Sequence, residues 1–204
     1  MKVLVYSIVF LLAGNCFSQD RKVGGPCEGC EAIHESPVPF EQLKAVDKLL
    51  DATWDGKKPL GINGVIYKAD GKTPAAGVVM YLYHTDESGR YPTKGNEKGW
   101  AKRHGYIRGW LRTNEKGEFK FVTLKPVAYP DAAEPAHIHI IIKEPGLTAY
   151  YIDDFVFNDD PLLTEEKRKK LPNRGGSGIV TLIDVGNMYK GERNIYLGRN
   201  IPGY

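Results

Sequence analysis

The chain has 204 residues, an apolar share of 42% and a formal net charge of +3. It is long enough to bury one sizeable hydrophobic core, so we expect a single main domain. The net charge is small and the basic residues are mixed with acidic ones, which gives no support for a nucleic acid or an anionic membrane as a partner.

Residues 1–18 have the layout of a secretory signal peptide. An apolar run from Val3 to Ala13 follows a basic residue and precedes small and polar residues. The run is too short to span a bilayer as a helix of a mature protein. We predict cleavage after Ser18, a secreted or periplasmic protein and no membrane span. Lipoprotein anchoring at Cys16 is the alternative, although Asn15 fits poorly before a lipidated cysteine.

Residues 19–59 are expected to form an N-terminal arm and one helix. In an oxidising compartment we expect a disulfide between Cys27 and Cys30. A thioredoxin-like redox motif would need a preceding strand and a following helix, and the Gly- and Pro-rich flank does not favour them. The helix is predicted over residues 39–54, where apolar side chains recur at helical spacing. These side chains are Phe40, Leu43, Val46 and Leu50.

Residues 60–204 are expected to fold as an all-β sandwich. Short β-prone runs alternate with turns rich in Gly, Asp and Asn, and no long helices lie between them. This pattern favours two packed sheets over a parallel sheet with crossover helices. The expected strands are residues 64–68, 78–84, 106–113, 118–122, 137–143, 150–157, 178–185 and 194–197.

Two histidines lie two residues apart on one of these expected strands. Side chains at positions i and i+2 of a strand point to the same face, so His137 and His139 could share a metal ion. Taken alone, the pair favours one packed and one hydrogen-bonded histidine over a metal site. Tyr91 and Tyr129 each precede a proline, which favours an extended backbone. Either tyrosine alone could be an ordinary half-buried residue.

Three segments taken in chain order resemble the intradiol ring-cleavage dioxygenases, the family of catechol and protocatechuate dioxygenases. They are Gly-Arg-Tyr-Pro at 89–92, Lys-Pro-Val-Ala-Tyr-Pro at 125–130 and Pro-Ala-His-Ile-His at 135–139. The resemblance extends over about residues 60–160.

This resemblance implies a ferric ion, Fe(III), held by four side chains, namely Tyr91, Tyr129, His137 and His139. Phenolate and imidazole are donors that favour ferric iron, whereas two histidines with one carboxylate favour the ferrous ion. The implied reaction joins dioxygen to a catechol-type ring and opens it between the two hydroxylated carbons, giving a muconate-type diacid. The resemblance also implies a catalytic role for Tyr129, which would leave the iron and accept a substrate proton.

The sequence departs from the family pattern at two positions. Glu134 stands where the family usually has an arginine that stabilises negative charge on the ring. Glu134 either lines the pocket or is a solvated loop residue. Arg108 or Arg90 could supply the missing cation; the substrate could itself be cationic or differently substituted; or turnover could be poor. Asp154 stands where a glutamine is common.

Other interpretations remain open at this level. Residues 71–83 resemble transthyretin-like and carboxypeptidase-regulatory-like domains, which would make the chain a binding module without catalytic iron. Zinc or copper could also replace iron. For the remaining histidines, a surface hydrogen bond is expected for His84 and an exposed loop for His104. The oligomeric state is not predicted.

Overall fold

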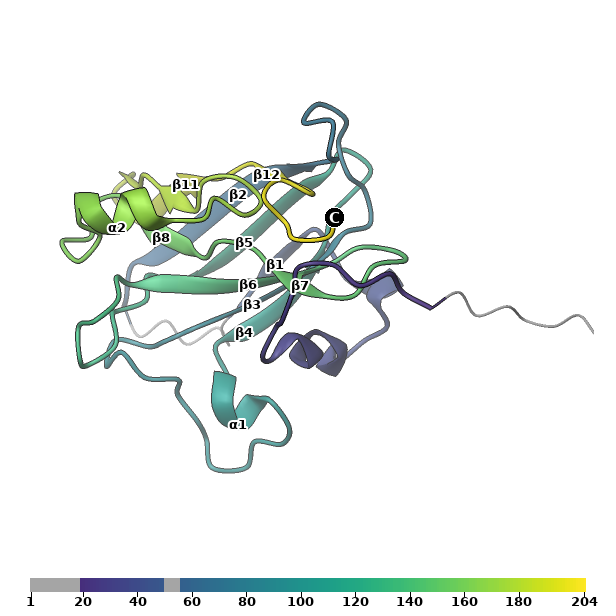
Figure 1. The fold of residues 1–204 in the computed structure, drawn as a ribbon. Coiled ribbons are helices and arrows are strands. Elements are labelled where there is room, and N and C mark those ends of the chain that lie inside the picture. Colours follow the sequence, from purple (N-terminus) through teal and green to yellow (C-terminus); the bar gives the residue numbers. More distant parts are fainter. Residues whose placement is uncertain (1–18, 50–55) are drawn as a thin grey trace, which may run out of the picture.

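The computed structural model describes residues 19–49 and 56–204, whose strands form two six-stranded sheets packed face to face (Figure 1). This confirms the expected all-β sandwich. The first sheet has the strand order β1-β5-β2-β11-β10, and β12 also pairs with β2. Its strands are β1 (Val46–Lys48), β2 (Pro59–Tyr67), β5 (Glu118–Leu124), β10 (Ile183–Asp184), β11 (Tyr189–Glu192) and β12 (Ile195–Tyr196).

The second sheet carries the candidate site. Its strand order is β4-β3-β6-β8-β9, and β7 also pairs with β6. Its strands are β3 (Val79–His84), β4 (Arg108–Arg112), β6 (His137–Lys143), β7 (Tyr150–Tyr151), β8 (Phe155–Phe157) and β9 (Ile179–Val180). The expected strand at 150–157 is thus split into β7 and β8, and the break between them contains Asp153 and Asp154.

Helices are few and short in the described part of the chain. They are the 3-10 helices η1 (Cys30–Glu35) and η2 (Phe40–Gln42) and the α-helices α1 (Ala101–His104) and α2 (Glu165–Lys170). None of the described helices is long and apolar enough to cross a bilayer.

The helix predicted over residues 39–54 is wrong for the described residues up to 49. After η2 the chain becomes extended, and Val46 in β1 pairs in parallel with Lys120 in β5. The Ala45 carbonyl accepts a hydrogen bond from the Lys120 amide at 2.7 Å, and the Lys44 carbonyl accepts one from the Arg112 amide at 3.0 Å. These hydrogen bonds go to the free edges of β4 and β5. Pairing with these edges stabilised the extended conformation more than the helical spacing of apolar residues stabilised a helix.

The second sheet buries side chains on both faces. On β6, Ile138, Ile140 and Ile142 point into the main core between the sheets. The alternate positions His137, His139 and Ile141 lie on the outer face, because successive side chains of a strand point to opposite sides. Ile141 belongs to a second apolar cluster on that face, and the two histidines lie beyond it along the same strand.

The N-terminal segment covers this second cluster. Ala32 and Ile33 of η1 are fully buried against Tyr81 and Trp110 of the second sheet. The Trp110 indole Nε1 donates a hydrogen bond to the Ile33 carbonyl at 2.9 Å. Figure 1 shows the segment alongside β4 and β7. The arm is therefore an integral layer of the domain.

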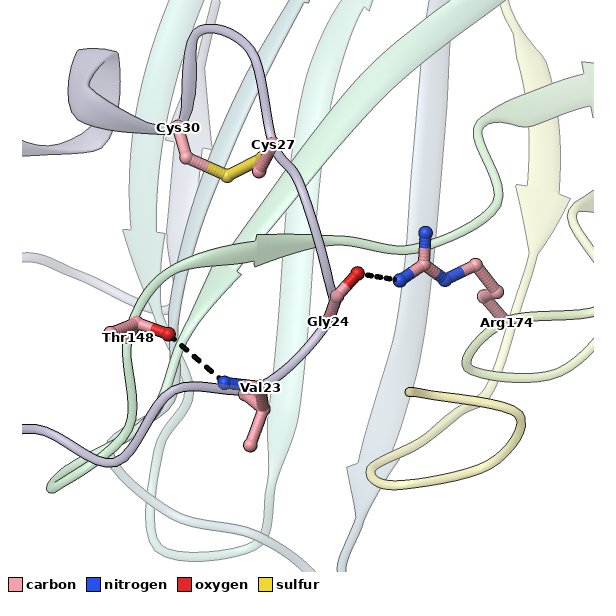
Figure 2. Close-up of a disulfide and its surroundings, with 6 residues drawn as sticks. All are labelled: Val23, Gly24, Cys27, Cys30, Thr148 and Arg174. Carbon is pink, nitrogen blue, oxygen red and sulfur yellow. Dashed lines mark hydrogen bonds between the residues drawn. A yellow bond between two sulfur atoms is a disulfide. The ribbon is translucent and has the colours of Figure 1, made fainter. Parts of the chain in front are cut away.

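A disulfide between Cys27 and Cys30 closes a tight loop in this arm, as expected (Figure 2). On one side of the loop the Val23 amide donates to the Thr148 side-chain hydroxyl at 3.2 Å. Arg174 donates to the Gly24 carbonyl from the opposite direction. The clip and these two contacts hold the arm on the outer face of the second sheet.

His84 is a core residue, which corrects the expectation of a surface hydrogen bond. It follows Met80 and Leu82 on the inner face of β3 and is 1% exposed. Its Nε2 lies 2.6 Å from the Thr123 hydroxyl and its Nδ1 lies 2.7 Å from the Thr85 carbonyl. Burial lowers the pKa of His84 to about 4, so the folded protein keeps this ring neutral.

We therefore expect the protein to lose stability as the pH falls from about 6.5 towards 4. In that window the unfolded chain binds a proton at His84 that the folded chain excludes, with an upper limit of about 3 kcal/mol. Urea unfolding at pH 7.5 and pH 5 measures the loss. His84→Gln, which has no titrating ring, should show a smaller loss between these two pH values than the parent. An equal loss in both proteins would show that His84 does not cause it.

Candidate metal centre

Two phenol oxygens and two imidazole nitrogens converge on the outer face of the second sheet. The Tyr91 Oη lies 2.8 Å from the Nε2 of His139 and in direct contact with the Tyr129 Oη. The Tyr129 Oη is 3.2 Å from the Nε2 atoms of both His137 and His139. The two Nε2 atoms are 3.1 Å apart. The structure thus brings together all four side chains singled out in the sequence.

The tyrosines reach the histidines from two loops that pack tightly against each other. Tyr91 lies in the loop after β3, and Tyr129 lies in the loop after β5. Gly89 has a φ of +70°, and a Cβ at this position would lie 2.1 Å from the Ala128 carbonyl oxygen. Only glycine combines this backbone with this approach, so Gly89 allows the two loops to meet. The Thr85 hydroxyl adds a 2.7 Å hydrogen bond to the Val127 carbonyl.

Both histidines are oriented by hydrogen bonds at the nitrogen that faces away from the cluster. The Nδ1 of His137 donates to the Pro135 carbonyl at 2.7 Å, and the Nδ1 of His139 donates to the Asp154 carboxylate at 3.0 Å. This tautomer is inferred because both partners are acceptors. Each Nε2 therefore presents a lone pair to the cluster, the arrangement that a metal-binding histidine needs.

The arrangement fits a metal cation. Without a cation, the His137 and His139 Nε2 lone pairs face each other at 3.1 Å with no hydrogen between them. The donor atoms are about as far apart as the ligands of one ion with metal–nitrogen bonds of about 2.1 Å. A carboxylate and these two histidines also lie close enough to form a possible ligand group. Asp154, however, binds the Nδ1 of His139 and so acts on the far side of the ring.

Burial disfavours charge on these groups in the absence of a cation. It raises the pKa of Tyr91 and Tyr129 above the usual range, and the hydrogen bond with Tyr129 raises that of Tyr91 further. Burial also lowers the pKa of His137. A bound multivalent cation would reverse the balance at the tyrosines, because it stabilises phenolate directly.

An aromatic stack supports His139 from the side. The Tyr83 ring packs on His139 with centroids 4.5 Å apart, and His104 stacks on the other side of Tyr83 at 3.8 Å. His104 is 6% exposed, and its Nδ1 lies 3.0 Å from the Tyr81 hydroxyl. The expectation of an exposed loop for His104 is therefore wrong. The sequence around His104 is basic and polar, and only the packing of α1 against the sheet buries it.

A cavity of about 560 Å³ opens beside the cluster. Tyr129, His137 and His139 line one part of it, and the rest of its lining combines apolar residues with the charged side chains of Glu134, Asp153, Asp154, Lys167 and Lys170. The apolar lining is Pro135, Ile152, Val156, Leu163, Leu171 and Pro172, with the ring of Tyr151. An apolar cavity with a few convergent polar groups suits an aromatic ligand. Glu134 also lines the cavity, and its side chain is 62% exposed, so it is both a pocket residue and a solvated one.

Neither arginine considered as a source of positive charge lies at this cavity. Arg108 donates to the Glu35 carboxylate at 2.9 Å, and its guanidinium lies over the Trp110 ring. Arg90 is exposed. The strand position of Arg108 places it on the same face as the cluster, but on β4, where the N-terminal segment supplies its partner.

The orienting role of Asp154 was not predicted from the sequence, because it depends on a contact with His139 of the neighbouring strand β6. Burial alone would raise the pKa of this carboxyl, but His139, His137 and Arg193 together hold the pKa below its usual value. We expect Asp154→Asn to weaken metal affinity by about 10- to 100-fold, because the amide orients and polarises His139 less well than a carboxylate. Competition for iron with a chelator measures this. Asp159→Asn, which changes an exposed acid paired with Lys125, should leave the affinity unchanged. Equal affinities in the two variants would contradict the orienting role.

Comparisons with known proteins identify the family of the chain. The family model described as Dioxygenase matches residues 34–171, more than half of the chain. Catechol 1,2-dioxygenase 1 of Acinetobacter lwoffii is 29% identical over 128 residues, 53% of this chain and 39% of that protein. Chlorocatechol 1,2-dioxygenase of Cupriavidus pinatubonensis is 27% identical over 154 residues, 65% of this chain and 56% of that protein.

Solved structures show the same fold at lower identity. The dioxygenase domain of a dioxygenase carbohydrate-binding protein fusion from Streptomyces sp. SirexAA-E matches with a TM-score of 0.55 and 19% identity. That match covers 88% of this chain and 97% of the other. Catechol 1,2-dioxygenase from Acinetobacter sp. ADP1 matches with a TM-score of 0.58 and 19% identity, covering 76% and 57%.

The chain spans about two fifths to just over half of the length of these curated relatives. The family match nevertheless covers strands β3, β4, β6, β7 and β8 of the second sheet and both tyrosine-bearing loops that build the four-residue cluster. The protein belongs to the intradiol ring-cleavage dioxygenase family, and this membership implies a non-haem iron centre.

Proposed function

We propose that this protein is a non-haem ferric-iron dioxygenase that cleaves catechol-type rings between the two hydroxylated carbons to muconate-type diacids. The observation that carries the proposal is the convergence of two phenol oxygens and two imidazole nitrogens beside an apolar cavity. Two phenolates and two neutral imidazoles suit ferric iron better than ferrous iron or zinc.

Tyr91, Tyr129, His137 and His139 would hold the ion. When bound, ferric iron supplies a Lewis acid that activates the catechol ring towards dioxygen. The two histidines are held in a ligand-ready orientation by Pro135 and Asp154.

Tyr129 is the residue best placed to exchange with a substrate. It lines the cavity, whereas Tyr91 is not among the lining side chains of the described residues. A catechol entering the cavity would therefore meet Tyr129 first. Burial raises the pKa of its phenol, so the Tyr129 oxygen would accept and hold a substrate proton.

Metal analysis and visible absorption test this proposal. The protein purified without residues 1–18 and loaded with ferric iron should bind one equivalent and show a charge-transfer colour. Anaerobic catechol should shift the absorption band, and admission of oxygen should then yield a muconate-type diacid. A colourless, iron-free protein after ferric loading would favour a binding module. Stoichiometric zinc or copper in its place would favour the other metal-site interpretation.

We also propose that the protein is exported, either secreted or periplasmic. The composition of residues 1–18, which lie outside the described part of the structure, supports this, as does the Cys27–Cys30 disulfide, which persists in oxidising compartments. Expression of the full chain with N-terminal sequencing of the product tests the proposal. A mature protein beginning at Gln19 is the expected result, and an intact Met1 in the cytoplasm would contradict it.

A further inference from the structure

A catechol that gives up its phenolic protons would bring negative charge into the cavity. A positive side chain at the cavity would stabilise that charge. Three carboxylates line the cavity, namely Glu134, Asp153 and Asp154. Arg108 lies elsewhere, paired with Glu35. A compensating positive charge at the cavity must therefore come from another described side chain.

Helix α2, which lies outside the histidine and tyrosine segments, carries positively charged side chains at the cavity. Among residues 19–49 and 56–204, the basic side chains that line the cavity are Lys167 and Lys170. Lys170 is 72% exposed, so water screens its charge, and it pairs with Glu166 on the same helix at 2.6 Å. Lys167 is 33% exposed and is the more enclosed of the two.

The Lys167 ammonium is held by the loop that leads from Tyr129 to His137. It donates a hydrogen bond to the Ala133 carbonyl, and it lies 3.6 Å from the Glu134 carboxylate. Both contacts come from residues just before the strand that carries the histidines.

The helix that carries Lys167 is itself fixed to the sheet. Arg168, the next residue, donates to the Asn158 carbonyl at 2.8 Å and to the Asn158 side chain at 2.7 Å. It also donates to the Leu163 carbonyl at 3.1 Å. Thr164 caps the helix by accepting from the Lys167 amide at 3.3 Å. The backbone of Lys167 is therefore anchored beside the cavity.

We propose that Lys167 is the cationic residue of the substrate pocket, and that Glu134 together with the Ala133 carbonyl positions its ammonium there. This inference rests on the proposed function. Lys167 stabilises the negative charge of the bound catecholate ring. Glu134 positions the Lys167 ammonium and does not contact the substrate itself. This role explains why a carboxylate lies at a cavity where it would otherwise repel a negatively charged substrate. No covalent step involves either residue.

The test compares two charge removals on the same helix. Lys167→Met and Lys169→Met each delete one ammonium, but Lys169 is exposed and is not among the cavity-lining residues. The iron-loaded proteins are titrated anaerobically with catechol, and the absorbance shift measures the dissociation constant. We expect Lys167→Met to raise that constant about tenfold and to lower kcat/KM about 10- to 100-fold, with Lys169→Met within about twofold of the parent.

Conservative and coupled variants separate the pocket role from a structural one. Lys167→Arg, which keeps the charge, should restore catechol affinity to within about threefold of the parent. Glu134→Gln should weaken affinity in the parent but have little further effect in Lys167→Met, because its role passes through the lysine. An increase in affinity on Glu134→Gln would overturn the positioning role.

Comparing two substrates shows whether Lys167 stabilises charge on the ring or binds a charged substituent. The assays are repeated with 3,4-dihydroxybenzoate. Similar losses with both substrates support stabilisation of the ring. A loss confined to the carboxylated substrate would overturn it in favour of substituent recognition, and equal behaviour of Lys167→Met and Lys169→Met would overturn it altogether. A parent protein that binds no iron or opens no ring would instead refute the proposed function.

Discussion

His139→Ala is expected to abolish stoichiometric iron binding and to lower ring-cleavage activity by about 1,000-fold or more. His139 contacts all three other members of the cluster, since its Nε2 lies within hydrogen-bonding distance of Tyr91, Tyr129 and His137. Loss of a metal-centred charge stabilisation of several kcal/mol corresponds to a factor of this size. Metal analysis after ferric loading and oxygen uptake with catechol measure the two effects.

His34→Ala is the matched control for this variant. His34 lies in η1, is exposed, and stacks on Phe40 rather than on the cluster. Removing it should leave iron content and oxygen uptake close to those of the parent. If His139→Ala kept one equivalent of iron and its colour, the four-residue cluster would not be the iron site.

Tyr129→Phe is expected to lower kcat/KM for catechol by about 100-fold or more while iron remains bound. The change removes the phenol oxygen that lines the cavity but leaves Tyr91, His137 and His139 in place. Loss of a positioned proton acceptor typically has an effect of about 10² to 10⁴. The charge-transfer band should also shift, because one of two phenolates is missing. Stopped-flow absorbance with catechol measures both changes.

The exposed Tyr106 offers the control, since Tyr106→Phe deletes a hydroxyl at a side chain that is 42% exposed. It should change neither the band nor kcat/KM. A Tyr129→Phe protein with parental turnover would assign proton transfer to another group. A Tyr91→Phe protein should instead lose iron affinity, because Tyr91 belongs to the four-residue cluster but is not among the cavity-lining residues.

Local sequence patterns correctly predicted the features that depend on the alternation of side chains along one strand. The pattern around His137 and His139 predicted a strand over residues 137–143, and β6 has these bounds. A period of two places both rings on one face whatever the rest of the fold does. The all-β sandwich likewise followed from short β-prone runs separated by turns. The disulfide followed from two cysteines close in the chain and an oxidising context.

Long-range contacts decided the features that were missed. Residues 39–49 carry a helical apolar pattern, yet the edge of β5 supplied backbone partners and made Val46–Lys48 a strand. Basic neighbours suggested exposure for His104, yet packing against Tyr83 buried it.

By itself, then, the amino-acid sequence determined the β-sandwich class, the paired histidines and the two tyrosine segments, because these depend on spacing along one strand or one loop. Only the tertiary structure decided that the four side chains meet, since Gly89 and Ala128 must approach across two loops. It alone placed Asp154 on His139 and Lys167 beside Glu134. Such pairings join residues far apart in the chain, and the energies of packing and hydrogen bonding that select them arise only when the sheets assemble.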